Sequence, residues 1–455
     1  MSIIDLGETA GSLDDESDRG PVLRRQVREV GIAVLAALCL LTLTGSVRAE
    51  PRGVRPLWSV PALERDSTVL TRDTAYLLQA EAGTTRLTAY ELAGGTVRWI
   101  RRLPGQVGWV QPVPDSGLLL VPTDRPTAGP GSPPASSTAN TAIDPHTGAE
   151  VSPAPRETIA LNARTGAELW RAPGDPDWIS GGTALLAERT SEGAPIRLRL
   201  IRLGDQSTIW SRETPGVQNH VITRDGDQPT RIITADGTGQ IKIFRYADGA
   251  YLTGARVPWV TPRPQDGYSN DIIVDRGFLV VNRIRQDIFD TTVYRLDSMA
   301  EAWSIKNTSG YAFPCGGPLC LTDGSAVSAH ELDNGRRLWK LAGSGNPWPI
   351  VGDRMVLNNS SDSEPLLVDT RTGRPVGEPA RGSTVVDSER PGSILLLRAT
   401  TSPPNRTSIT RWDLHTGRQH LLGAIDDMAG YGCQSAKRYL ACVRNGRLDV
   451  MEIAG

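Results

Sequence analysis

Short segments in which apolar and polar residues alternate recur along this chain, and turns rich in glycine separate them. One eleven-residue pattern is clearest at 89–99, 160–170 and 329–339, where each copy begins with alanine and ends with tryptophan. Alternation with a period of two predicts β-strands, and the central glycine predicts a hairpin between two of them. Such a unit cannot bury its apolar face alone, so the pattern predicts a repeat protein built from stacked strands.

The turn glycine defines an index position in every copy of the repeat. This position is occupied in turn by Gly95, Gly166, Gln206, Gly249, Met299, Gly335, Gly373 and Gly417. A tryptophan follows four residues later at Trp99, Trp170, Trp210, Trp303 and Trp339, so the two copies without glycine keep the tryptophan. With two alternating segments before each index, a copy offers about four strands every forty residues or so, which is typical of β-propeller blades. We expect these tryptophans to be structural.

The two ends of the repeat region predict how the ring closes. Residues 450–455 align with residues 89–94 and stop before the next index position, so the last unit needs an outer strand from elsewhere. Residues 55–60, which include Trp58, have the pattern of an outer strand without inner strands before it. We expect this N-terminal strand to complete the last blade and remove the free sheet edge. The predicted fold is an all-β propeller of eight or nine four-stranded blades over residues 54–455.

The first fifty residues predict export of the propeller. Residues 1–28 form an acidic leader with a disordered composition, and residues 29–48 predict one transmembrane helix, because Val30 to Val47 carry no charge and would reach about 27 Å as a helix. More arginines precede this segment than follow it, which places the N-terminus inside. A signal peptide cleaved after Ala49 is the alternative. The expected location is the cell membrane, with a single pass and the propeller outside the cytoplasm.

Residues 122–157 differ in composition from the repeats. They contain many proline, serine, threonine and glycine residues and fall between the first two index positions, which are unusually far apart. This composition predicts a surface insertion within the second blade.

Four cysteines outside the membrane segment predict two disulfides. Cys320 and Cys442 occupy the same position in two different copies, and Cys315 and Cys433 lie shortly before them. The two copies should not be neighbouring blades, whereas bridged Cα atoms lie within about 7 Å, so we expect the pairs Cys315–Cys320 and Cys433–Cys442. Disulfides agree with an exported compartment, and a short-spaced redox pair or a metal site is the alternative.

The charge distribution argues against a nucleic-acid partner. The formal net charge is -2, and beyond the first thirty residues basic residues do not form runs longer than a pair. A phosphate-backbone footprint requires a basic stripe or patch.

The complete pattern at 160–170, Ala-Leu-Asn-Ala-Arg-Thr-Gly-Ala-Glu-Leu-Trp, resembles the repeat of pyrroloquinoline-quinone-type propellers. The resemblance covers roughly residues 54–455 and is closest to the membrane-anchored members found in high-G+C bacteria. In that family the repeat tryptophan docks one blade on the next, and the members include quinone-dependent dehydrogenases and non-catalytic propellers. The dehydrogenases carry two adjacent cysteines and a calcium site, which have no counterpart here. The resemblance therefore implies a binding protein without quinone or calcium, and a dehydrogenase with an atypical site is the alternative.

A second aromatic series supplies the candidate binding residues. It lies just beyond the outer strands, where the following inner strand begins, at Trp109, Trp178, Tyr311, Trp348 and Tyr431, with Trp259 or Tyr268 in one more copy. Such connections gather on one face around the channel, where large rings could hold a protein, peptide or envelope component. Ordinary packing between blades is the other interpretation. No arrangement of catalytic or metal-binding residues stands out, so we expect a non-enzymatic binding or scaffold module.

Overall fold

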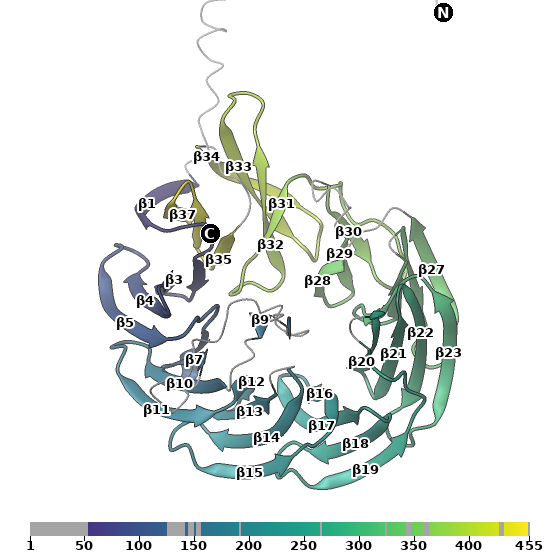
Figure 1. Cartoon of the computed structure of the whole chain (residues 1–455). Coiled ribbons are helices and arrows are strands. Elements are labelled where there is room, and N and C mark those ends of the chain that lie inside the picture. The colour runs from purple at the N-terminus through teal and green to yellow at the C-terminus, as the bar shows by residue number, and fades with distance from the viewer. Residues whose placement is uncertain are drawn as a thin grey trace, which may run out of the picture. The chain divides into compact units, whose positions relative to one another are not determined.

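The repeat region folds into a ring of nine β-sheets (Figure 1). The computed structural model describes residues 53–124, 142–143, 150–151, 156–190, 193–263, 266–323, 325–342, 347–357, 364–426 and 432–453. Each sheet is one blade, and its strands run from the innermost at the channel to the outermost at the rim. Each sheet packs one face on the preceding blade and the other face on the following blade. Successive residues of a strand point to these two faces in turn, which is why the strands follow a pattern with a period of two.

The first four blades follow one another along the chain. Blade 1 contains β2 (Ser67–Leu70), β3 (Thr74–Glu81), β4 (Thr84–Glu91) and β5 (Val97–Pro104). Blade 2 contains β6 (Gln111–Val113), β7 (Leu118–Asp124), β10 (Arg156–Asn162) and β11 (Glu168–Pro173), with the short helix η1 (Pro114–Ser116) after β6. Blade 3 contains β12 (Asp175–Ser180), β13 (Thr183–Arg189), β14 (Pro195–Arg202) and β15 (Thr208–Glu213). Blade 4 contains β16 (Val217–Asp225), β17 (Gln228–Asp236), β18 (Gln240–Arg245) and β19 (Tyr251–Arg256).

The remaining blades complete the ring. Blade 5 contains β20 (Tyr268–Asp275), β21 (Phe278–Arg285), β22 (Ile288–Arg295) and β23 (Glu301–Thr308). Blade 6 contains β24 (Ala312–Pro314), β25 (Leu319–Thr322), β26 (Ala326–His330) and β27 (Arg337–Ala342). Blade 7 contains β28 (Pro347–Val351), β29 (Arg354–Leu357) and β30 (Leu366–Asp369). Blade 8 contains β31 (Ser383–Val386), β32 (Ser393–Ala399), β33 (Arg406–Asp413) and β34 (Gln419–Asp426). Blade 9 contains β35 (Cys433–Ala436), β36 (Tyr439–Arg444), β37 (Arg447–Ile453) and β1 (Val54–Pro61).

Strand β1 closes the ring as predicted. It pairs antiparallel with β37 along its whole length, from Val54 opposite Ile453 to Pro61 opposite Arg447, and Trp58 faces Val450. In Figure 1 the purple β1 lies beside the yellow β37. The predicted ring of eight or nine blades is therefore confirmed with nine, the last of which combines strands from both ends of the repeat region.

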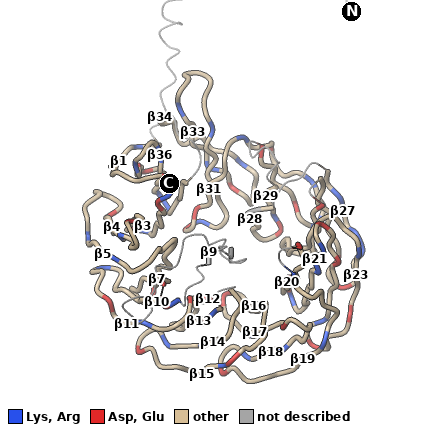
Figure 2. Tube along the Cα trace, in the orientation of Figure 1, with Lys and Arg blue, Asp and Glu red and all other residues tan. Residues whose placement is uncertain are grey.

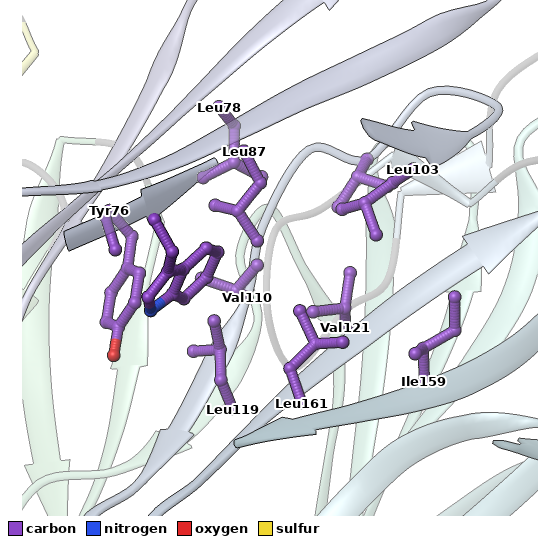
Figure 3. Packing of buried hydrophobic residues seen from close by; sticks show 12 residues of the cluster. Tyr76, Leu78, Leu87, Leu103, Val110, Leu119, Val121, Ile159 and Leu161 are labelled. Carbon is purple, nitrogen blue, oxygen red and sulfur yellow. The ribbon is translucent and has the colours of Figure 1, made fainter. Parts of the chain in front are cut away.

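The hydrophobic core is divided among the interfaces between neighbouring blades, which we call seams. Each of the nine seams has its own cluster of buried apolar residues. Figure 3 shows the seam between blades 1 and 2, where Tyr76 and Leu87 of blade 1 pack against Leu119 and Ile159 of blade 2. The core is thus distributed around the ring, as expected for repeats that bury their faces on one another.

Six seams share one tryptophan contact. In each, the ring nitrogen donates a hydrogen bond to a backbone carbonyl in the index turn of the next blade, three residues before the index position. The pairs are Trp58 with Leu92, Trp99 with Ala163, Trp170 with Leu203, Trp210 with Tyr246, Trp303 with Leu332 and Trp339 with Thr370, at 2.7 to 3.2 Å. The repeat tryptophan therefore docks one blade on the next at these seams.

The index position is left-handed in all eight copies. Six are glycines with φ between 67° and 72°, while Gln206 has φ 60° and Met299 has φ 55°. A Cβ atom on Gly166 would lie 2.6 Å from the Trp99 ring, so glycine serves there both the backbone conformation and the close approach of the tryptophan. Gln206 and Met299 keep the turn at a conformational cost that glycine avoids.

Blade 7 differs from the predicted four strands. Its described part has three, and the segment after the index turn touches β30 through the Val368–Pro375 bridge and a hydrogen bond from Val376 to Leu367. Pro375 and Pro379 lack the backbone N–H that a strand ladder needs, and Gly377 stands where other blades have tryptophan. These residues explain why an outer strand does not form.

Both predicted disulfides are present, and each joins the innermost strand region of a blade to the second strand. Cys315 and Cys320 bridge in blade 6, with Cα atoms 5.7 Å apart, and Cys433 and Cys442 bridge in blade 9, with Cα atoms 4.1 Å apart. The two ends of the predicted insertion 122–157 belong to β7 and β10 of blade 2, and the described residues between these strands form a two-stranded ribbon of β8 (Ala142–Ile143) and β9 (Glu150–Val151).

The predicted membrane segment 29–48 lies outside the described residues, as does the leader 1–28. Among the residues that the structure does describe, no helix has the length and apolar character needed to cross a membrane.

Candidate functional site

The ring has two distinct faces. The connection face carries the segments that lead from an outermost strand to the next innermost strand, together with the hairpins between second and third strands. Backbone hydrogen bonds join these segments, as from Gly105 to Gly83 at 3.2 Å. The turn face carries the index turns and the turns between first and second strands, joined for example by the hydrogen bond from Leu92 to Asp73 at 3.0 Å. The predicted aromatic residues belong to segments near the connection face.

Tyr311 is the predicted residue that the structure places most clearly for binding. It lies on the connection that leads into β24, and 38% of its surface is exposed. Its ring centroid is 6.3 Å from that of Phe289 in β22 and 5.8 Å from that of Phe313 in β24. We call these three side chains the aromatic patch. Burial of one side of the ring raises the pKa of the Tyr311 phenol, so it stays a neutral hydrogen-bond donor near neutral pH.

The backbone beneath Tyr311 is tightly fixed. A Cβ atom on Gly310 would lie 1.1 Å from the carbonyl oxygen of Thr322, so only glycine allows the connection to pack on this hairpin of blade 6. The Thr308 hydroxyl donates to the Gly310 carbonyl at 2.9 Å, and the Thr322 amide donates to the Tyr311 carbonyl at 3.1 Å. Tyr311 is therefore presented in one backbone conformation.

A buried polar network supports the other side of the patch. Asn282 donates to the Ala312 carbonyl at 3.1 Å and accepts from the Thr291 hydroxyl at 2.7 Å, and Asn282 and Thr291 have no exposed surface. Asp290 accepts from the Asn307 amide at 2.9 Å and from Arg285 at 2.7 Å. A satisfied network of this kind fixes the positions of the groups it joins. Because it links blade 5 to the start of β24, Phe289 and Tyr311 are held in a defined relation.

The other predicted aromatic residues do not join this patch. Trp109 is half-buried on the connection before β6. Trp178 lies within β12 and packs against the core of the seam between blades 3 and 4, with the Arg224 guanidinium 5.0 Å from its ring. The side chain of Trp348, in β28, and the whole of Tyr431 lie outside the described residues. Trp178 thus corresponds to the packing interpretation, whereas Tyr311 fits the binding interpretation.

A charged cluster occupies the inner strands of blades 3 and 4. Asp177 of β12 contacts His220 of β16 at 2.7 Å and Arg189 of β13 at 2.9 Å, and all three side chains are nearly buried. In the described part of the chain, no group of three or more acidic, histidine or cysteine side chains is arranged to hold a metal ion. The cluster therefore joins neighbouring inner strands through the hydrogen bond between Asp177 and His220 and the ion pair between Asp177 and Arg189.

A serine and a histidine side chain are in contact in blade 6. Ser328 and His330 lie two residues apart on β26, with the hydroxyl 3.1 Å from Nε2. Nδ1 lies 2.9 Å from the Gly335 carbonyl, which can only accept, so Nδ1 carries the proton and Nε2 accepts from Ser328. The His330 ring stacks on Trp303, with centroids 6.0 Å apart. The pair therefore belongs to the packing of the seam between blades 5 and 6.

The sequence missed Phe289, Asn282 and Asp290, which complete and support the patch. Phe289 follows a hairpin within blade 5, whereas the predicted series followed outer strands. Its nearness to Tyr311 depends on how blade 5 packs on blade 6. The sequence contains one weak indication of this site. A glycine directly before an aromatic residue, as at Gly310, suggests that another backbone segment approaches closely.

Among the described residues, positive and negative charges are interspersed around the ring. Figure 2 shows positions of both signs interspersed along the blades. Many of them are paired between neighbouring strands, as Arg156 with Asp175 at 2.8 Å and Arg354 with Asp369 at 2.6 Å. This pattern differs from the basic stripe of a nucleic-acid-binding surface.

Comparison with known proteins identifies similar folds among solved structures. No family model matches the chain, and no curated protein matches it. BamB from Moraxella catarrhalis is 12% identical with a TM-score of 0.43, and the match covers 88% of this chain and 100% of that one. The dihydro-heme d1 dehydrogenase NirN, in complex with DHE, is 14% identical with a TM-score of 0.41, over 84% of this chain and 80% of that one. A eukaryotic initiation factor is 9% identical with a TM-score of 0.49, over 82% and 90%. At this level of similarity, no function can be transferred to this nine-bladed β-propeller.

Proposed function

We propose that this protein is a non-catalytic binding or scaffold module that holds a protein or peptide on its connection face, with Tyr311 as the central contact. The observation that carries the proposal is the exposed tyrosine on a fixed backbone between two phenylalanines. Aromatic side chains provide large contact area at low entropic cost, and they dominate the energetics of protein interfaces. A rigid scaffold also lowers the ordering cost of binding.

The proposal places the propeller outside the cytoplasm, tethered through residues 29–48. Two disulfides support this location, since such bonds persist in oxidising compartments. Membership of the pyrroloquinoline-quinone-type propellers is part of the same proposal and rests on the repeat at 160–170. A tethered ring with an exposed binding face would gather envelope components at the membrane surface.

The test uses cross-linking in cells that express the full chain, followed by identification of the captured protein. We expect wild type to capture a partner that Tyr311→Ala loses, with binding weakened at least about tenfold, because a hot-spot residue contributes about 2 kcal/mol or more. Tyr251→Ala is the matched control, since Tyr251 is 57% exposed on the outer strand of blade 4. Equal capture by both variants would exclude Tyr311 as the contact.

A further inference from the structure

The seam between blades 8 and 9 is built differently from the tryptophan seams. In blades 1, 2 and 6 a small residue, such as Ala89, faces the repeat tryptophan across the hairpin. Arg411 occupies the equivalent position of blade 8, six residues before the index Gly417, and Leu421 stands where the tryptophan would be. A guanidinium therefore occupies a place that is apolar in the other copies.

Three buried polar groups gather beside Arg411 near the turn face. Asp387 is 1% exposed and Ser435 is 2% exposed. Residues 387 and 435 form a bridge between the inner strands of the two blades, and pairing of Val386 with Ile394 brings Asp387 beside Ser393. Among the described residues, the Asp387 Oδ2 atom and the hydroxyls of Ser393 and Ser435 have no hydrogen-bond partner. Buried polar groups of this kind normally have partners, so their concentration at one place indicates a bound group.

The other oxygen of Asp387 has a structural role. Its Oδ1 atom accepts from the backbone amides of Glu389 and Lys437, both at 3.0 Å. This contact holds the six-residue turn 387–392 of blade 8 on the inner strand of blade 9. Asp387 is therefore fixed as a carboxylate whose second oxygen still accepts a hydrogen bond.

Two arginines lie close together beside these groups. Burial lowers the pKa of Arg411, and the nearby positive charge of Arg390 lowers it further, while Asp387 opposes this effect. In the part of the chain that the structure describes, Arg390 and Lys437 have no ion-pair partner. Arg72 of blade 1 pairs with Glu389 at 3.3 Å. Like charges held close together in a partly buried seam favour an anion between them.

The hydrogen-bonding groups restrict the kind of anion. Guanidinium groups and serine hydroxyls can donate to oxygen atoms of a ligand, whereas Asp387 Oδ2 can only accept, so the ligand must also donate. A sulfate or carboxylate ion has no proton to donate near neutral pH, and a cation would offer no acceptors. A phosphate that keeps one proton provides both kinds of group.

We propose that the seam between blades 8 and 9 binds a phosphate group that retains a proton, through Arg390, Arg411, Ser393 and Ser435, with Asp387 accepting the phosphate O–H. Both free phosphate and a phosphomonoester have this chemistry. A bound phosphate would link two blades at one of the seams that lack the tryptophan contact, and binding to the folded state alone would stabilise the ring. This proposal is independent of the aromatic patch on the opposite face.

Calorimetric titration of the full chain at pH 6 tests the proposal with inorganic phosphate, sulfate and acetate as separate probes. We expect saturable phosphate binding that is at least about tenfold tighter than sulfate or acetate binding. Sulfate and acetate cannot donate a hydrogen bond to the buried Oδ2 atom of Asp387, and this opposes their binding. Glycerol 1-phosphate distinguishes the sources: binding equal to phosphate indicates a phosphomonoester site, and loss indicates a site for the free ion. Equal, non-saturating responses to phosphate and sulfate would overturn the proposal.

Three variants locate the site. Arg390→Ala should weaken phosphate binding about tenfold or more, since a charge-assisted hydrogen bond is lost, while Arg164→Ala, in an index turn of the same face, should leave it unchanged. Ser435→Ala should also weaken binding, and an unchanged affinity would contradict the role of its hydroxyl. Asp387→Asn keeps the Oδ1 acceptor and replaces Oδ2 with a donor, so it should raise the sulfate affinity relative to phosphate. Unchanged discrimination in a folded Asp387→Asn protein would exclude Asp387 as the acceptor.

Discussion

The seam between blades 1 and 2 and the seam between blades 8 and 9 differ in the residues that fill their turn-face sides. At the first, Trp99 is 8% exposed, packs on Gly166 and donates to the Ala163 carbonyl at 3.0 Å. At the second, Arg411 and the Asp387 turn occupy the turn-face side, and apolar packing is confined to the rest of the seam. The turn-face side of the first seam is filled by a tryptophan whose donor is satisfied, and that of the second contains buried polar groups without partners among the described residues.

Blades 4 and 7 lack the tryptophan because Thr253 and Gly377 stand at its position, whereas blade 8 precedes a composite blade that lacks the acceptor. The repeat tryptophan donates to the index turn of the following blade, and in blade 9 no such turn joins β37 to β1, because β1 comes from the start of the repeat region. A tryptophan on β34 would lack its usual acceptor. Closure of the ring by a distant strand therefore removes the docking site at the last seam, and side chains from the turn of blade 8 take its place.

The largest expected effect comes from removing a docking tryptophan. Trp99→Ala should lower the free energy of unfolding by about 3–5 kcal/mol, because it creates a cavity and leaves a buried carbonyl without its donor. Leu421→Ala, at the equivalent position of blade 8, should change it by about 0.5 kcal/mol or less, since Leu421 is 49% exposed. Urea denaturation measures both. Similar effects of the two substitutions would remove the distinction between the seams.

Adding a methyl group at Gly166 in the index turn tests the packing of the Trp99 ring on this turn. Gly166→Ala should destabilise the fold by about 2–4 kcal/mol, because φ is 70° and the new Cβ would lie 2.6 Å from the Trp99 ring. Gly83→Ala is the control for backbone strain alone, since φ is 71° and no atom lies within 4 Å of its Cβ. Denaturation midpoints should therefore fall more for Gly166→Ala, and equal shifts would contradict tight docking of the tryptophan.

The disulfide of the composite blade should contribute an intermediate amount. Replacing both Cys433 and Cys442 by alanine should cost about 2–3 kcal/mol, as expected from the entropy of closing a short loop. The same replacement of Cys315 and Cys320, which close a still shorter loop in blade 6, should cost slightly less. Thermal unfolding of the two double variants compares them. A much larger loss in blade 9 would show that the bond also supports the polar seam.

The smallest effect concerns alkaline pH. Burial, and then the charge of Asp73, raises the pKa of Tyr76 to about 12, and burial raises that of Tyr246 to about 12 as well. A raised folded pKa gives stability that is complete below pH 10 and is lost as the pH rises through 10 to 12. Unfolding followed from pH 8 to 12 should show a decline of about 2 kcal/mol for each of the two phenols, and Tyr76→Phe should remove the share of Tyr76. A pH-independent free energy of unfolding would contradict burial of these phenols.

The ring was predictable from sequence because each copy of the repeat contains the same short pattern of residues. The left-handed index turn, the tryptophan four residues later and the strand alternation are all properties of neighbouring residues. Even Gln206 and Met299, which lack the glycine signal, were identified because the tryptophan after them remained. Closure by β1 followed from one incomplete copy at each end of the repeat region.

The sites were less predictable because they depend on contacts between blades. Phe289 reaches Tyr311 from another blade, and the Asp387 turn reaches Ser435 across a seam. The prediction of an outer strand in blade 7 also failed where Pro375 and Gly377 interrupt the local pattern. The repeat pattern thus predicts the blades. The role of a residue that departs from the pattern depends on its neighbours in the folded structure.

Hydrogen exchange measured by mass spectrometry tests the contrast between the two kinds of seam most directly. The amides of Ser388 and Lys437 cross the seam between blades 8 and 9, where they donate to the Ser435 carbonyl and to Asp387. We expect peptides 387–392 and 433–438 to exchange through local opening, well before peptide 160–170 of the tryptophan seam, because their amides cross the seam beside buried polar groups without partners in the described part of the chain. Equal protection of these peptides, up to global unfolding, would contradict the account.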